Sequence, residues 1–133
     1  MRQVFRALVI CTVIAQILYW SLPYVDYMWL SIDHLALLDQ GGLGASIPPS
    51  EAFHWLTLLI WVLVSIGLYF YIGIARTAFV VLYVLSAVLG LFYGIQVLTP
   101  VEVLLANVMA LADGAIIAIM YFTSVAEAFR EAS

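Results

Sequence analysis

"LLANVMALADGAIIAI", residues 104–119, is the stretch that decides how this chain folds. It is almost wholly apolar, and an aspartate, Asp113, lies close to its middle. About 20 mostly apolar residues in a row are long enough to cross a bilayer as an α-helix. We therefore predict a membrane-spanning helix over residues 100–123, with one ionisable group in its interior.

The composition of the whole chain is that of a membrane protein. Of its 133 residues, 67% are hydrophobic and only 9% are charged. A soluble domain of this size leaves too much of its surface exposed to hide so much apolar area. The four basic residues are all arginines and are scattered, so the clustered cations of a nucleic-acid-binding protein are missing. We expect the lipid bilayer as a partner and no nucleic acid.

Three further apolar runs predict spans of about residues 4–22, 52–71 and 77–97. The predicted fold is an all-α, integral membrane four-helix bundle with up-down topology, forming a single transmembrane domain over residues 1–133. Pro23 is expected to end the first span. The linkers that follow the second and third spans are short, which makes the joined spans antiparallel neighbours.

The one long connection, residues 23–51, joins the first and second spans. Its apolar residues follow a helical spacing, which predicts a short amphipathic helix on the outer side of the membrane. The four arginines all fall on the other side of a four-span model: Arg2, Arg6, Arg76 and Arg130. Arginine and lysine collect on the cytoplasmic side of membrane proteins. The connection contains aspartate and glutamate but no arginine or lysine. We therefore expect both termini in the cytoplasm and a location in a bacterial inner membrane.

Asp113 lies about 20 Å along the fourth span from Pro100, near the centre of the bilayer. A carboxylate at this depth costs about 2.5–3.5 kcal/mol on insertion scales. No arginine lies at the same depth, so we expect a protonated side chain, or one that faces a wet cavity. Candidate hydrogen-bond partners include Gln16 and Ser86. Three interpretations stay open: an interhelical hydrogen bond, a proton or cation site, and a contact with a cofactor or lipid headgroup.

Glu102 and Asn107 share the fourth span with Asp113. Glu102 and Asp113 project within about 20° of each other on a helix, and Asn107 is expected to widen this polar strip. "TPVE", residues 99–102, also predicts a capping box, in which Thr99 and Glu102 satisfy each other's backbone N–H groups. Glu102 is therefore either a helix cap or an outer gate that accepts protons.

Small residues recur every four positions on the third and fourth spans. Helices in lipid associate where small side chains let their backbones approach closely. We predict helix-packing faces, within the chain or between protomers, at Gly90, Gly94, Ala106, Ala110, Gly114 and Ala118.

Both histidines fall on the predicted outer side. His34 and His54 could meet to ligate haem, and "EAFH", residues 51–54, has one of the two Glu-x-x-His motifs that a di-iron bundle requires. A surface metal site with Asp33 is another possibility. The sequence contains no phosphate-binding glycine loop and no spacing that supports a catalytic triad. We expect no metal, no cofactor and no enzymatic activity.

Residues 75–129 resemble small four-span bacterial inner-membrane proteins of unassigned function. The likeness rests on Arg76 after the second span, on "TPVE" at 99–102, and on Asp113-Gly114 followed by "MYFTSV" at 120–125. It covers about half of the chain and implies no chemistry.

The leading hypothesis for function is an accessory or assembly subunit that contacts other membrane subunits or a second copy of itself. The alternatives are a homo-oligomeric ion or proton channel, or small transporter, that uses Asp113, and a haem- or quinone-associated subunit of a respiratory complex.

Overall fold

The computed structural model describes residues 1–38, 42–47 and 50–131. Asp39, Gln40, Gly41, Pro48 and Pro49, which belong to the predicted outer connection, lie outside the described residues. The described part contains six α-helices and one 3-10 helix: α1 (Arg2–Val25), η1 (Asp26–Met28), α2 (Ile32–Leu38), α3 (Glu51–Tyr69), α4 (Gly73–Gly90), α5 (Pro100–Phe122) and α6 (Val125–Glu131). Four of them, α1, α3, α4 and α5, are long and apolar enough to cross a membrane. The all-α prediction with four such helices is confirmed.

Side-chain caps define the starts of α5 and α3, whereas the end of α1 differs from the prediction. Thr99 N donates to Glu102 Oε2 at 2.6 Å and Glu102 N donates to Thr99 Oγ1 at 3.2 Å, so the predicted capping box of α5 is confirmed. Ser50 caps α3 in the same way by accepting from Phe53 N. The expectation that Pro23 ends the first helix is wrong, because α1 continues to Val25. The fixed φ of proline is itself helical, and this position leaves only one carbonyl of the preceding turn without its usual donor.

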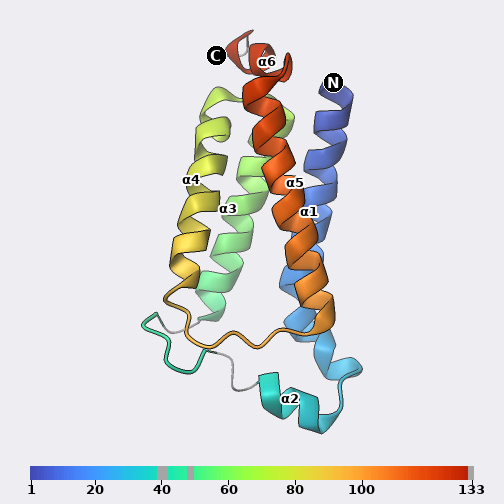
Figure 1. The fold of residues 1–133 in the computed structure, drawn as a ribbon, viewed down its shortest axis with the longest axis vertical. Helices are drawn as coiled ribbons and strands as arrows, with labels where there is room; N and C mark the ends of the chain where they lie inside the picture. Colours follow the sequence, from blue (N-terminus) through green and yellow to red (C-terminus); the bar gives the residue numbers. More distant parts are fainter. Residues whose placement is uncertain (39–41, 48–49, 132–133) are drawn as a thin grey trace.

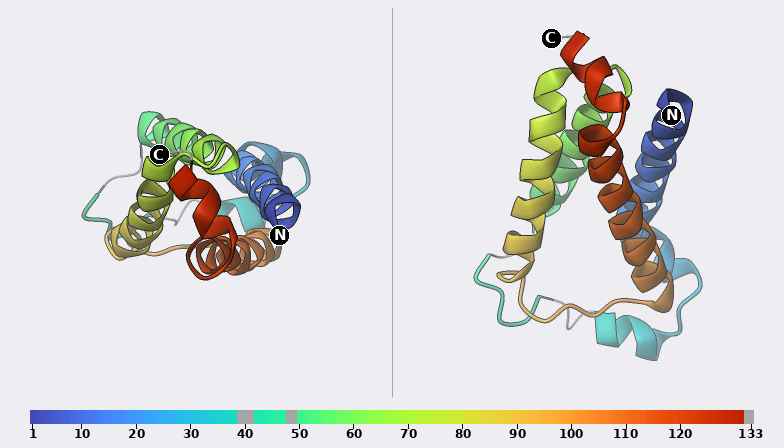
Figure 2. Two further views of the ribbon diagram at one scale, coloured as in Figure 1. Left: turned by 90° about the horizontal axis from the view of Figure 1, so that it is seen from above. Right: turned by 45° about the horizontal axis from the view of Figure 1, so that its top comes forward.

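The four long helices pack in the order α5–α1–α3–α4 (Figures 1 and 2). Both chain termini lie at one end of the bundle, which we call the terminal end; α2 and the connection between α4 and α5 lie at the other, the α2 end (Figure 1). Along the described chain α4 and α5 are not a closely packed pair, and they diverge toward the α2 end (Figure 2). The expectation of a short linker and neighbouring third and fourth helices is therefore wrong.

Backbone hydrogen bonds explain the long connection between α4 and α5. Residues 92–95 pair with residues 42–47 of the outer connection: Ser46 N donates to Phe92 O at 2.9 Å, and Ile95 N donates to Leu43 O at 2.9 Å. Gly94 has a φ of +73° and lies so close to this segment that a Cβ would stand 2.6 Å from Ala45 N. Gly94 therefore lies in the connection after α4, which ends at Gly90, and the prediction that it is a helix-packing residue is wrong.

The apolar core fills the terminal half of the bundle. Phe5 of α1 stacks on Tyr71 at 5.8 Å between ring centroids and meets Phe129 of α6 edge-on at 5.9 Å. Tyr71, in the turn between α3 and α4, has a φ of +60°, a region that non-glycine residues seldom occupy. Its ring contacts and a 3.2 Å hydrogen bond from its hydroxyl to Arg2 O hold it there. The α3–α4 turn is thus locked to both ends of the chain.

The closest helix–helix approach is between α3 and α4, where a Cβ on Gly67 would stand 2.6 Å from Ala75 Cβ. We expect Gly67→Ala to lower the free energy of unfolding by about 1–3 kcal/mol, because the two backbones must separate. Gly114→Ala is the matched control, since a Cβ there meets nothing within 4 Å. Unfolding by SDS titration in mixed micelles measures both. Equal effects of the two substitutions would contradict the close approach at Gly67.

Candidate functional site

Asp113 is buried inside the bundle against α1. Only 5% of the residue is exposed, and Gln16 of α1 is 2% exposed. Asp113 Oδ1, Gln16 Oε1 and Thr12 Oγ1 are buried without a hydrogen-bond partner among the described residues. Buried polar atoms nearly always have partners, because leaving one unpaired costs about 1–3 kcal/mol. Three such atoms close together make this the polar centre of the molecule.

A cavity of about 400 Å³ opens beside these groups, between α4 and α5. Gln16, Ser86 and Asp113 line it together, so the structure gathers three of the polar residues that the sequence singled out. Ala106 and Ala110 form its α5 wall, and Tyr83 adds a phenol from α4. The Tyr19, Trp20, Trp61 and Met109 side chains, which the sequence analysis did not connect with Asp113, supply much of the apolar lining. The site can therefore hold an apolar group that carries a hydrogen-bond donor.

Two residues of the predicted polar strip lie elsewhere. Asn107 is exposed, and its Nδ2 donates to Val103 O one turn earlier at 2.9 Å. Glu102 is buried at the α2 end, where its carboxylate accepts from Thr99 N. A shared helix face brings neither of them into the cavity, because one is turned outward and the other is used as a cap.

Gly90 and the small residues of α5 make no close helix–helix approach in the part of the chain that the structure describes. Ala110, Gly114 and Ala118 of α5 are exposed, and a Cβ added to Gly90 or Gly114 would meet nothing within 4 Å. The actual close approach, Gly67 to Ala75, was missed. The sequence feature that could have predicted this approach is a glycine one turn before a very short interhelical linker, where two backbones have to converge.

The cavity stops at the apolar core. Moving along α5 from Asp113 toward the terminal end, the next inward residues are Ile116 and Met120, both fully or almost fully buried. Phe79 of α4 and Phe5 of α1 complete this apolar layer. A single copy of the described chain therefore has a polar centre that is separated from the terminal end by packed side chains.

A pair of carboxylates lies at the α2 end and was not anticipated. Asp26 of η1 is buried close enough to Glu102 of α5 to feel its charge. Burial raises the pKa of Asp26 above its usual 3.8, the negative charge of Glu102 raises it further, and a hydrogen bond with Trp29 acts in the opposite direction. The chain brings these two residues together only through the packing of α1 on α5, which no local pattern reveals.

The histidines take part in local contacts at the α2 end. His54 Nε2 lies 3.0 Å from Trp20 O, and His34 Nδ1 lies 3.0 Å from Ser31 Oγ. Within residues 1–38, 42–47 and 50–131, no three His, Cys, Asp or Glu side chains are grouped as a metal would need. His54 instead lies among aromatic rings, with the Trp20 ring centroid 4.4 Å away.

No family model, curated protein or solved structure matches this chain.

The unpartnered Oδ1 predicts the effect of removing the carboxyl group. We expect Asp113→Leu to raise the free energy of unfolding of the isolated chain by about 1–3 kcal/mol, because an unpaired buried acceptor is lost. Asp113→Asn keeps an acceptor of the same shape and should leave stability nearly unchanged. SDS titration of the two variants measures the difference. A strong destabilisation by leucine would show that Asp113 is paired within the fold.

The Asp26–Glu102 pair predicts a pH dependence of stability. Because the folded pKa of Asp26 is raised, the folded state holds a proton that the unfolded state has already released. Stability should therefore be highest at acid pH and fall as the pH rises above about 4 through the raised pKa. Glu102→Gln should flatten this slope, since glutamine keeps the capping acceptor but removes the charge.

Unfolding of parent and Glu102→Gln between about pH 4 and pH 6 tests this expectation. Asp26→Asn is the matched control, because it removes the titrating group itself and should abolish the same part of the slope. A steeper slope in Glu102→Gln than in the parent would be inconsistent with the pair.

Proposed function

We propose that this chain is a non-enzymatic integral membrane protein that acts as an accessory or assembly subunit of a membrane complex. In this proposal the four long helices cross a bacterial inner membrane up and down, α2 lies on the outer surface, and both termini are cytoplasmic. The partner is a transmembrane helix of another subunit, or of a second copy, and it enters the seam between α4 and α5.

The charges support this orientation. Arg2 and Arg6 begin α1, Arg76 lies in the first turn of α4, and Arg130 lies on α6, so all four arginines are at the terminal end. Asp26, Asp33 and Glu51 lie in or beside elements at the α2 end (Figure 1). A bilayer that collects arginine at the cytoplasmic surface places the terminal end inside.

One observation carries the functional proposal: Asp113 and Gln16, each with a buried oxygen that has no partner among the described residues, line a cavity beside an unpacked face of small residues. Helices in lipid associate through close packing of small residues, supplemented by interhelical hydrogen bonds. The α5 face of Ala110, Gly114 and Ala118 offers the first, and Asp113 offers the second. A partner helix with a hydroxyl, amide or indole N–H at the matching depth would satisfy both.

The test compares two bulky substitutions on neighbouring residues of α5. We expect Gly114→Leu to reduce the amount of partner subunit that co-purifies with the chain by at least about tenfold, because leucine keeps the partner's backbone away. Ala115→Leu is the matched control, since Ala115 is exposed and lies beside the stripe, on the side of α5 that carries the exposed Leu104 and Leu111. Native mass spectrometry from a gentle detergent reports the association, the identity of the partner and any bound cofactor. A chain that remains monomeric at native expression levels would refute the proposal.

The second candidate is an oligomeric ion or proton channel, or small transporter. It is favoured by the burial of an ionisable group beside Gln16 in a cavity of about 400 Å³. The apolar layer of Ile116, Met120 and Phe79 argues against conduction through a single copy. Flux in liposomes that is lost in both Asp113→Asn and Asp113→Leu would favour this candidate. Flux that persists in either variant would exclude proton transfer by Asp113.

A further inference from the structure

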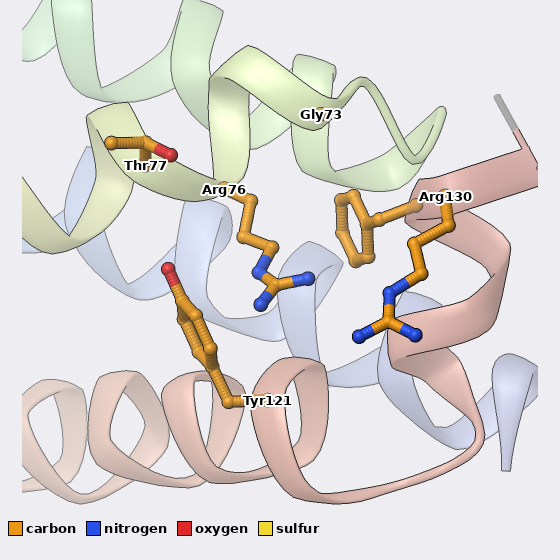
Figure 3. Close-up of a pocket in the computed structure, with 6 residues that line it drawn as sticks. Gly73, Arg76, Thr77, Tyr121 and Arg130 are labelled. Carbon is orange, nitrogen blue, oxygen red and sulfur yellow. The ribbon is translucent and has the colours of Figure 1, made fainter. Parts of the chain in front are cut away.

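A second pocket, of about 510 Å³, lies at the terminal end, far along the helices from Asp113. Arg76 and Thr77 of α4, Tyr121 of α5 and Arg130 of α6 line it, and Figure 3 shows the two arginine side chains reaching toward the same space. This pocket shares no lining residue with the cavity beside Asp113.

Arg76 is held in place by an aromatic ring. Its guanidinium carbon lies 3.8 Å from the centroid of the Tyr121 ring, which is the geometry of a cation–π contact. Stacking fixes the plane of the guanidinium group and leaves its edge N–H groups free to donate. Arg76 is half-buried, so the charge is presented from the wall of the pocket and not from a flexible surface chain.

The two positive charges have no negative partner in the described chain. Among the described residues the one ion pair joins Arg2 to Glu131, at 3.1 Å, and leaves Arg76 and Arg130 out. The pocket also includes Gly73, the first residue of α4, whose N-cap residue Ile72 offers no side-chain acceptor. The N-terminus of a helix favours negative charge, so it adds to the field of the arginines.

Exposed apolar side chains occur on the same turns of α4 and α5 that line the pocket. Ile74, next to Gly73 in the sequence, is 79% exposed, and Phe122, next to Tyr121, is 87% exposed. Side chains of this kind are stable where they meet acyl chains. Paired guanidinium groups on helices that also expose apolar side chains at this level match a ligand with an anionic phosphate head and an apolar tail.

We propose that this pocket, defined by Arg76, Tyr121 and Arg130, binds a phosphate oxyanion. Its source is the headgroup of an anionic phospholipid in the adjoining leaflet. The guanidinium groups donate to the phosphate oxygens, while Ile74 and Phe122 contact the first part of the acyl chains. The bound lipid ties α4 to α6 at the terminal end, because Arg76 belongs to α4 and Arg130 to α6.

The test uses the full chain in detergent with either phosphatidylglycerol or phosphatidylcholine, and native mass spectrometry counts the retained lipids. We expect Arg76→Gln and Arg130→Gln each to lower the apparent affinity for phosphatidylglycerol about tenfold, the weight of one charge-assisted contact. Arg6→Gln is the matched control: Arg6 lies at the same end, outside the pocket and, among the described residues, in no ion pair, so its loss should change affinity less than about twofold. Phosphatidylcholine should bind weakly to all four proteins.

A parallel titration with inorganic phosphate separates the two sources of the oxyanion. Phosphate binding that depends on Arg76 and Arg130, without retained phosphatidylglycerol, would support the oxyanion site but assign it to free phosphate. Equal losses in Arg6→Gln and Arg130→Gln would overturn the proposal, because they would reflect a general attraction of negative charge to this end of the protein. Absence of both lipid and phosphate binding would overturn it as well. Arg130 is exposed on the short terminal helix, so its variant tests the site even if Arg76→Gln disturbs folding.

Discussion

Lipid offers no hydrogen bonds, and this constraint shapes every polar feature of the molecule. Backbone groups are satisfied within four long helices, and some polar side chains donate to the preceding turn, as Asn107 does to Val103 O. Asp113, Gln16 and Thr12 differ, because each keeps a buried oxygen without a partner in the described chain. Asp113 and Gln16 also line one cavity, which gives the bundle a chemical centre.

The two ends of the bundle differ in how closely their helices pack. The terminal half is a packed aromatic core in which Phe5, Tyr71 and Phe129 link the start of the chain, the α3–α4 turn and the last helix. The α2 half is more open, since α4 and α5 diverge there. The packed core at one end and the unfilled seam between α4 and α5 are the features on which the proposed association with a partner helix rests.

The sequence predicts the helices well, because length, apolar composition and caps are local properties. The Thr99–Glu102 capping box follows from four residues, and the structure contains it. Packing partners are not local. A four-residue spacing grouped Gly94 with Gly90, but the backbone of residues 42–47 provides hydrogen bonds that end α4 before Gly94 is reached. Likewise, Asp113 and Ser86 both line the cavity. Glu102 projects from the same face of α5 as Asp113, but it does not line the cavity, because its carboxylate caps the start of the helix.

The backbone pairing between residues 42–47 and 92–95 has a mechanical consequence. It joins the loop before α3 to the loop between α4 and α5. These two hydrogen-bonded segments therefore move together, and we call them the strap. A helix that wedges α4 and α5 apart must drag this strap with it and so displace the start of α3. The α2 end of the molecule would then change with the occupancy of the seam, through a few main-chain hydrogen bonds.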